Sequence, residues 1–158
     1  MQRGFTLVEM IAVLVIISII SISVLPRAQS TESMVLNGRA LQLASDLRYV
    51  QARSMTGGQR FCLSLTASGY SLTTTDGSNN CTATTDAHPA GLAQPIQPCV
   101  SCITWSNLPA NVVQFDGLGV PYTAAATTLA SNAVITLADG GITKTVTISP
   151  TTGRILVQ

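Results

Sequence analysis

An uninterrupted apolar segment near the N-terminus restricts most strongly how this chain can fold. From Phe5 to Leu25 every residue is apolar or small and hydroxylic, except Glu9. As a helix that rises about 1.5 Å per residue, the segment would be about 30 Å long, which matches the hydrocarbon thickness of a bilayer. No small-residue cleavage site follows it, as one would in a secretory signal. We therefore expect a transmembrane helix that stays in the mature protein.

The charges around this segment indicate which part is exported. Arg3 precedes the segment and favours a cytoplasmic N-terminus, so that the chain after Arg27 would be exported. Charged residues make up only 9% of the sequence, against about 25% in typical soluble domains, and this also suits an exported protein. The formal net charge of +1 indicates no general attraction to nucleic acid or to acidic lipid.

Glu9 is the one ionisable residue inside the apolar segment. A charged side chain in a membrane span costs about 2.5–3.5 kcal/mol on insertion scales, so it needs a partner or a route to water. Glu9 could extend to the nearby membrane interface, or it could pair with a positive charge from another chain. A newly exposed N-terminal amine is the obvious cation, because pairing lowers the cost of burying either charge.

The residues from Gly4 to Glu9 read Gly-Phe-Thr-Leu-Val-Glu and lead directly into the apolar run. This motif resembles the processing site of type IV prepilins and pseudopilins. The resemblance implies that a prepilin peptidase cuts between Gly4 and Phe5, that Phe5 becomes an N-methylated N-terminus, and that Glu9 guides assembly by meeting the Phe5 amine of a neighbouring subunit. It also implies a pilin fold, with other pilins or pseudopilins and an inner-membrane assembly platform as partners.

A second helical stretch follows the apolar segment. Its apolar residues recur at spacings of three and four, which predicts an amphipathic helix over 27–57 that ends at Gly57-Gly58. The apolar stripe comprises Leu36, Ala40, Leu43, Leu47 and Val50. Pro26 lies at the junction of the two stretches and is expected to kink the helix, because proline removes a backbone donor.

Residues 58–158 predict a β-rich head. Alternating residues over Phe61–Leu65 and from Tyr70 to Leu72 predict a hairpin around Ser68-Gly69. A short strand is expected near Ile103, and four further apolar runs begin at Val112, Val134, Lys144 and Arg154. We expect these strands to form one antiparallel sheet whose apolar face packs on the helix stripe, giving an α+β fold.

The stretch from Thr73 to Ser101 is polar and rich in turn residues, and predicts an irregular loop. The cysteines are Cys62, Cys81, Cys99 and Cys102. An even number of cysteines in an exported part predicts two structural disulfides that staple residues 73–102, with three pairings open. A zinc or redox site at Cys99-Val100-Ser101-Cys102 is disfavoured, because no second CxxC and no histidine pair accompanies it.

The remaining residues do not indicate an enzyme, a cofactor or a metal site. His88 is predicted to be a solvated loop residue, and the single Trp105 a core residue. Gly117-Leu118-Gly119 predicts a tight turn rather than a phosphate-binding loop, which needs a strand-to-helix setting. Aspartates near glycines and polar turn residues are expected to cap backbone donors; they are Asp76, Asp86, Asp116 and Asp139.

The last third of the chain carries Phe115-Asp116-Gly117-Leu118-Gly119-Val120-Pro121 and Thr152-Gly153-Arg154-Ile155. These phrases are similar to the GspH/FimT-like minor pilins. Some FimT-like relatives bind DNA through a motif resembling Gly-Arg-X-Arg, but this chain reads Gly-Arg-Ile-Leu from Gly153 and lacks the second arginine. The turn phrase from Ser68 to Leu72 also resembles accessory pilins of mannose-sensitive haemagglutinin systems. Because the second arginine of the DNA-binding motif is missing, nucleic acid is not expected as a partner.

Together these resemblances predict a minor pilin or pseudopilin of a type IV pilus or a type II secretion pseudopilus, acting in filament initiation or tip assembly. Residues 1–4 would be the leader peptide and residues 5–26 the membrane and assembly helix. The head would lie in the periplasm before assembly and in the filament, near its tip, afterwards. The alternatives are a tip adhesin that binds through residues 73–101, a DNA-uptake minor pilin and a major pilin.

Overall fold

The computed structural model describes residues 6–99, 102–123 and 127–158, with side chains for all of these except residues 22–31, 83 and 84. The chain divides into two compact units, Met1–Val35 and Leu36–Gln158. One long helix, α1 (Leu7–Gly57), supplies residues to both units. Within the described residues, none of the helices combines the length and the hydropathy needed to cross a membrane.

Helix α1 begins with a cap that its local sequence explains. The carbonyl of Thr6 accepts the backbone N–H groups of Glu9 and Met10, and the Thr6 hydroxyl accepts the Glu9 N–H at 3.4 Å. Thr-Leu-Val-Glu therefore forms the first half of a capping box, in which a threonine satisfies a free N–H at the start of the helix. An acidic residue in the first turn also suits the positive end of the helix dipole.

The C-terminal end of α1 lies where the sequence predicts it. The helix ends at Gly57, and Gly58 follows with φ of 66°, a left-handed conformation that glycine adopts without strain after a helix. Pro26 falls within the bounds of α1, but its side chain lies outside the described residues, so the kink at Pro26 stays a prediction.

The head contains two antiparallel sheets. The first has the order β3-β2-β1-β5-β6; its strands are β1 (Phe61–Leu65), β2 (Tyr70–Thr75), β3 (Cys81–Thr85), β5 (Val112–Phe115) and β6 (Pro121–Tyr122). The second has the order β4-β7-β8-β9; its strands are β4 (Ile103–Ser106), β7 (Ala133–Asp139), β8 (Ile142–Ile148) and β9 (Ile155–Val157). The prediction of a single sheet was wrong, because β4 pairs with β7 instead of with its chain neighbour β5.

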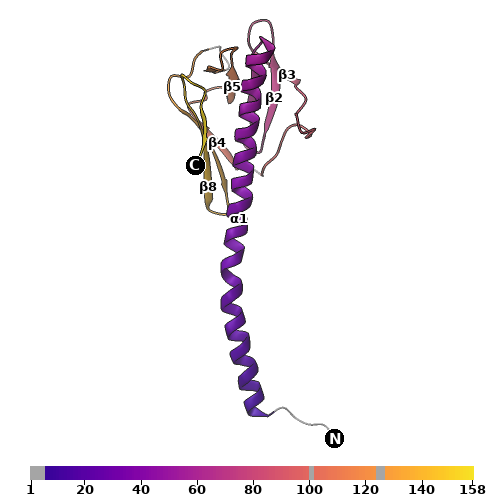
Figure 1. The fold of residues 1–158 in the computed structure, drawn as a ribbon, viewed down its shortest axis with the longest axis vertical. Helices are drawn as coiled ribbons and strands as arrows, with labels where there is room; N and C mark the ends of the chain where they lie inside the picture. Colours follow the sequence, from indigo (N-terminus) through magenta and orange to yellow (C-terminus); the bar gives the residue numbers. More distant parts are fainter. Residues whose placement is uncertain (1–5, 100–101, 124–126) are drawn as a thin grey trace. The chain divides into compact units, whose positions relative to one another are not determined.

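The head part of α1 packs on these sheets through the predicted stripe. Leu36, Ala40, Leu43, Leu47 and Val50 are all buried. They share one hydrophobic core with apolar residues of both sheets, including Leu63 of β1 and Ile135 of β7. In the view of Figure 1, α1 runs in front of the strands, with β2 and β3 on its right and β4 and β8 on its left. A single helix thus covers the apolar faces of two sheets, which makes the fold α+β.

The predicted strands are largely confirmed. The predicted hairpin is present, and Leu65 lies opposite Tyr70 in its register. The prediction of an irregular loop from Thr73 was wrong in its first part, because β2 continues to Thr75 and β3 follows. β3 reads Cys-Thr-Ala-Thr-Thr, so it has no alternation of apolar and polar residues to reveal it. The two-residue β6 was also missed.

Candidate functional site

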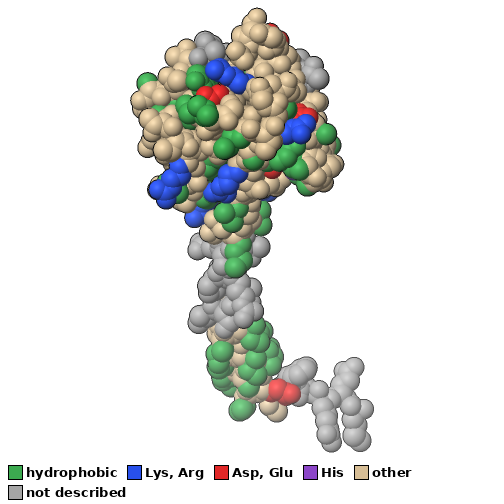
Figure 2. Space-filling view, turned by 45° about the horizontal axis from the view of Figure 1, so that its top comes forward, with side chains coloured by type: hydrophobic (Ala, Val, Ile, Leu, Met, Phe, Trp, Pro, Cys, Tyr) green, Lys and Arg blue, Asp and Glu red, His purple; other side chains and the backbone are tan. Residues whose placement is uncertain are grey.

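The first unit presents a helical surface that is apolar on every side. All described side chains from Thr6 to Ser21 are exposed, and eleven of them are large hydrophobic residues. The hydroxyls of Ser18 and Ser21 donate to the carbonyls of Leu14 and Ile17 at 2.7 and 2.8 Å, so they add no unsatisfied donor to this surface. Figure 2 shows this stretch as hydrophobic side chains with an acidic one near its start. Such a helix requires lipid or other apolar helices around it.

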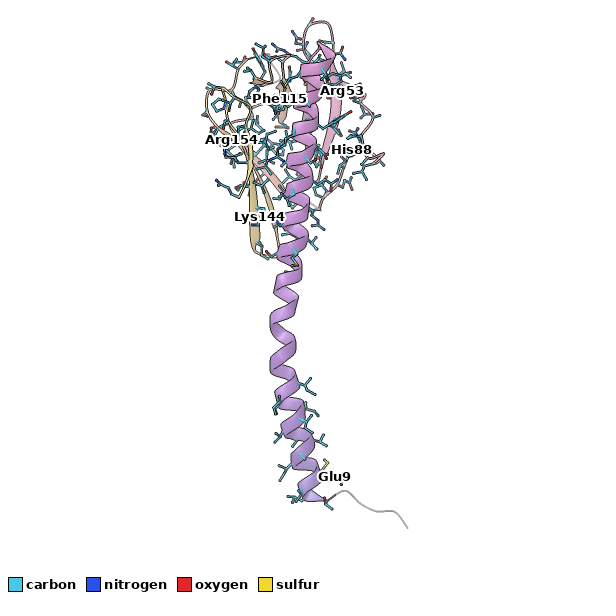
Figure 3. The ribbon with its side chains drawn as sticks, viewed as in Figure 1. Glu9, Arg53, His88, Phe115, Lys144 and Arg154 are labelled. Carbon is cyan, nitrogen blue, oxygen red and sulfur yellow. A yellow bond between two sulfur atoms is a disulfide. The ribbon has the colours of Figure 1, made fainter. Side chains whose placement is uncertain are left out.

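Glu9 supplies the acidic side chain, and its position near the start of α1 can be followed in Figure 3. Among the described residues, no cation lies within ion-pair distance of its carboxylate. Gly4 and Phe5, the predicted cleavage and methylation residues, lie outside the described part of the chain. The pairing between Glu9 and a Phe5 amine therefore stays a prediction.

The head contains a buried polar cluster that corrects the prediction for His88. The His88 side chain is only 3% exposed, and its Nε2 lies 3.0 Å from Oδ1 of Asp46. Because Nδ1 accepts the N–H of Ala90 at 3.1 Å, a neutral imidazole holds its proton on Nε2 and donates it to Asp46. Figure 3 places His88 beside α1. Asp46 and His88 are 42 residues apart, a separation at which sequence pattern gives no pairing signal.

Tyr70 completes this cluster. Its hydroxyl donates to Oδ2 of Asp46 at 2.6 Å, and its side chain is buried. Burial, together with the hydrogen bond and the charge of Asp46, raises the pKa of Tyr70 well above its usual value. Both carboxylate oxygens of Asp46 are thus satisfied, as a buried carboxylate requires. The cluster joins α1, β2 and the segment that follows β3.

The segment from Asp86 to Ile96 is bound to β2. The N–H of Leu72 donates to the side-chain oxygen of Gln94 at 2.6 Å, and the Gln94 amide donates to the carbonyl of Asp86. Tyr70 and Ile96 exchange two backbone hydrogen bonds. The second half of the predicted loop is therefore a packed segment. It covers one edge of β2 at the first residues of that strand.

The aspartates near the turns do not all have the predicted role. Oδ1 of Asp76 accepts the N–H groups of Asn80 and Ser78, each at 2.9 Å, and these bonds lower the pKa of Asp76. Asp116 caps the turn before β6 in the same way. Asp139 instead forms an ion pair with Arg39 at 2.9 Å. Within the described residues, no three His, Cys, Asp or Glu side chains gather into a metal site.

Gln51 of α1 binds the two glycine-containing turns of the C-terminal third. Its Nε2 donates to the carbonyls of Gly119 at 2.9 Å and Gly153 at 3.3 Å. Gly153 has φ of 61°, and a Cβ there would collide with the Gly119 carbonyl and the Gln51 amide. The two turns, which lie far apart in the sequence, thus meet at one side chain of the helix. Only the tertiary structure reveals this contact.

The cysteines form two pairs. Cys62 of β1 bonds to Cys81 of β3, and Cys99 bonds to Cys102. β1 and β3 lie on either side of β2, and strands two apart in a flat sheet are roughly 10 Å apart. The Cα atoms of Cys62 and Cys81 are 6.0 Å apart, so β3 approaches β1 more closely than a flat sheet allows, near the register irregularity between Thr73 and Thr75.

A long helix laid on antiparallel sheets, preceded by an apolar helical segment with one carboxylate, is the architecture of a pilin-type protein. Residues 1–25 match the model of the prokaryotic N-terminal methylation motif, and residues 39–152 match the model of the type II transport protein GspH. The chain therefore belongs to the GspH family. The resemblance predicted from the N-terminal motif and the C-terminal phrases is confirmed.

The crystal structure of the type IV minor pilin FimU from Pseudomonas aeruginosa has a similar fold. The two chains are 16% identical, the match covers 81% of this chain and 91% of that chain, and the TM-score is 0.52. At this identity the similarity supports the fold alone. No curated protein matches this sequence significantly.

Proposed function

We propose that this chain is a minor pilin or pseudopilin that joins a type IV pilus or a type II secretion pseudopilus and acts in filament initiation or tip assembly. The observation that carries the proposal is the exposed helix from Leu7 to Ser21, apolar all round, with Glu9 as its one ionisable side chain. Such a surface fits a filament core made of packed helices. The GspH family match supports a place in such a filament, and the fold shared with a type IV minor pilin is compatible with it.

In this proposal, a prepilin peptidase cleaves between Gly4 and Phe5, and the new Phe5 amine is N-methylated. Residues 5–26 lie in the inner membrane, with the head in the periplasm, until the assembly platform moves the subunit into the filament. The match to the N-terminal methylation motif supports these steps.

Glu9 would then pair with the Phe5 amine of a neighbouring subunit. A buried carboxylate and ammonium that pair cost far less than either one alone, so the pairing would favour correct register between subunits. An anchor that served the membrane alone would need no carboxylate at this position.

Two measurements test the proposal. The intact mass of the assembled protein should lack residues Met1 to Gly4 and carry one added methyl group; a mass that retains the leader would exclude the processing step. Glu9→Gln removes the charge but keeps a side chain that is compatible with a capping box. We expect normal membrane insertion and a loss of incorporation into filaments.

Glu32→Gln is the matched control, because Glu32 is also an exposed residue of α1 and is the second of the two glutamates in the chain. It should assemble as the unaltered chain does. Equal incorporation of both variants would show that the charge of Glu9 is dispensable. Deleting the gene tests the proposed role in filament initiation. Loss of filaments supports this role, whereas normal filaments contradict it.

A further inference from the structure

Two adjoining hollows lie in the head, where the connection from β4 to β5 meets the connection from β6 to β7. The larger hollow has a volume of about 380 Å³ and is lined by residues of both connections, including Asn107, Thr123 and Thr128. The smaller has a volume of about 360 Å³ and is lined by Trp105 and Asn111, among others. Asn107 and Pro109 line both hollows, which therefore adjoin, and the two hollows together are termed the cleft. Each is within the size range of small-molecule sites.

Backbone hydrogen bonds hold one wall of this cleft. The N–H of Thr123 donates to the carbonyl of Thr127 at 2.7 Å, and the N–H of Leu129 donates to the carbonyl of Pro121 at 3.3 Å. The Asn107 amide donates to the carbonyl of Asn132 at 2.8 Å and so joins the two connections.

The connection from β4 to β5 has an unusual backbone. Asn107 and Asn111 have φ of 61° and 57°, and they are two of the three non-glycine residues with positive φ in the described chain. Such conformations cost about 1–3 kcal/mol and concentrate at ligand sites. Asparagine tolerates them better than most residues, so the two amide side chains stand in this connection at modest cost.

The chemistry of the lining is neutral and rich in hydrogen-bonding groups. None of the described residues that line either hollow carries a charge. Thr127, Thr128 and Ser131 are exposed and offer hydroxyls, Asn111 offers an amide, and Asn107 offers its amide oxygen. Trp105 packs against the core and is partly buried. Amides and hydroxyls both donate and accept, and an indole ring provides a flat apolar surface.

We propose that this cleft is a binding site for a neutral saccharide. The sugar hydroxyls would bond to the amide and hydroxyl side chains, and the apolar C–H face of a sugar ring would pack on Trp105. An anionic ligand would find no cation among the lining residues, and a purely apolar ligand would leave the amides and hydroxyls unpaired. The inference goes beyond the proposed function in the filament, because a subunit could assemble without using the cleft.

Trp105 provides the readout, since it is the only tryptophan in the chain. The full-length processed protein would be kept in lauryldimethylamine oxide micelles, which have no sugar headgroup to compete. Tryptophan emission would be followed during titration with neutral oligosaccharides of glucose, mannose, galactose and N-acetylglucosamine, and with oligogalacturonate as a charged comparison. We expect a saturable change in emission with at least one neutral oligosaccharide and none with oligogalacturonate.

Two variants connect such a change to the cleft. Thr128→Val removes an exposed hydroxyl for which the described residues show no internal hydrogen bond, and Asn111→Gly removes an exposed amide while keeping a residue suited to positive φ. Each should weaken binding by about tenfold, the effect of one lost hydrogen bond. Asn79→Gly is the matched control, with φ of 62° in the turn between β2 and β3, and should bind normally.

The proposal is overturned if no neutral oligosaccharide changes the emission, if oligogalacturonate binds as tightly, or if both cleft variants bind as well as the Asn79→Gly control. None of these results bears on filament assembly, so the proposed function would be unaffected by them.

Discussion

Tyr70 and Asp46 are joined by a buried hydrogen bond of 2.6 Å that connects β2 to the head segment of α1. His88 bonds to the other oxygen of the same carboxylate. One helical side chain thus holds both the hairpin and the segment from Asp86 to Ile96 against the helix. The stability of the head should therefore depend on Asp46 more than on any exposed charge.

Asp46→Ala should lower the free energy of unfolding by about 3 kcal/mol, because it leaves the Tyr70 hydroxyl and the His88 imidazole buried without their acceptor. Urea unfolding followed by Trp105 fluorescence measures this. The control is Asp139→Ala, which breaks the exposed ion pair with Arg39 and should cost about 0.5 kcal/mol or less. Equal losses in the two variants would contradict the role given to Asp46.

The raised pKa of Tyr70 predicts a loss of stability in alkaline solution. In the unfolded chain a tyrosine ionises near pH 10, whereas in the folded head Tyr70 stays protonated. The contribution of Tyr70 to the free energy of unfolding is therefore fully present below about pH 10. Above that pH it falls by up to about 1.4 kcal/mol per pH unit, until the pKa of Tyr70 in the folded head is reached. Urea unfolding between about pH 9 and pH 11 would show the decline.

In Tyr70→Phe, the unfolding free energy should start lower but decline less with pH. Tyr122→Phe is the matched control: the Tyr122 ring contacts Arg60, and the bond from Tyr70 to Asp46 is intact. It should keep the alkaline decline of the unaltered chain. A decline of the same slope in Tyr70→Phe would rule out Tyr70 as its source.

Gly153→Ala should destabilise the head more than Gly141→Ala. Both glycines have positive φ, 61° and 81°, so both substitutions strain the backbone by about 1 kcal/mol. A Cβ at Gly141 meets nothing within 4 Å, whereas one at Gly153 collides with the Gly119 carbonyl and with Gln51. We expect an additional loss of about 1–3 kcal/mol at Gly153, as for other overpacked sites. Equal unfolding midpoints for the two variants would contradict the close packing of Gly153 against Gln51 and the Gly119 carbonyl.

The two disulfides should differ in their contribution to stability. Cys62 and Cys81 are separated by 19 residues, and Cys99 and Cys102 by 3. In the loop-entropy relation, the longer loop corresponds to about 3 kcal/mol and the shorter to about 2 kcal/mol. Replacing the first pair by alanines should therefore lower the unfolding free energy more than replacing the second. The reverse order would show that strain or packing outweighs loop entropy here.

Local signals explain which elements the sequence predicts well. The apolar stripe from Leu36 to Val50 and the hairpin from Phe61 are strictly periodic, and the structure has both. β3 is missed because its threonines show no alternation, and β6 because it has only two residues. The second sheet is missed because periodicity identifies strands without their partners, and the pairing of β4 with β7 joins segments far apart in the chain.

Sequence alone determines the apolar character of the first helical stretch, the position of Glu9 in it and the end of the helix at Gly57, because each depends on composition or on neighbours within a few residues. Only the tertiary structure brings His88 to Asp46, Gln51 to Gly153 and the two connections that form the cleft to each other. These contacts depend on how the chain crosses between the two sheets, and no local pattern encodes that path.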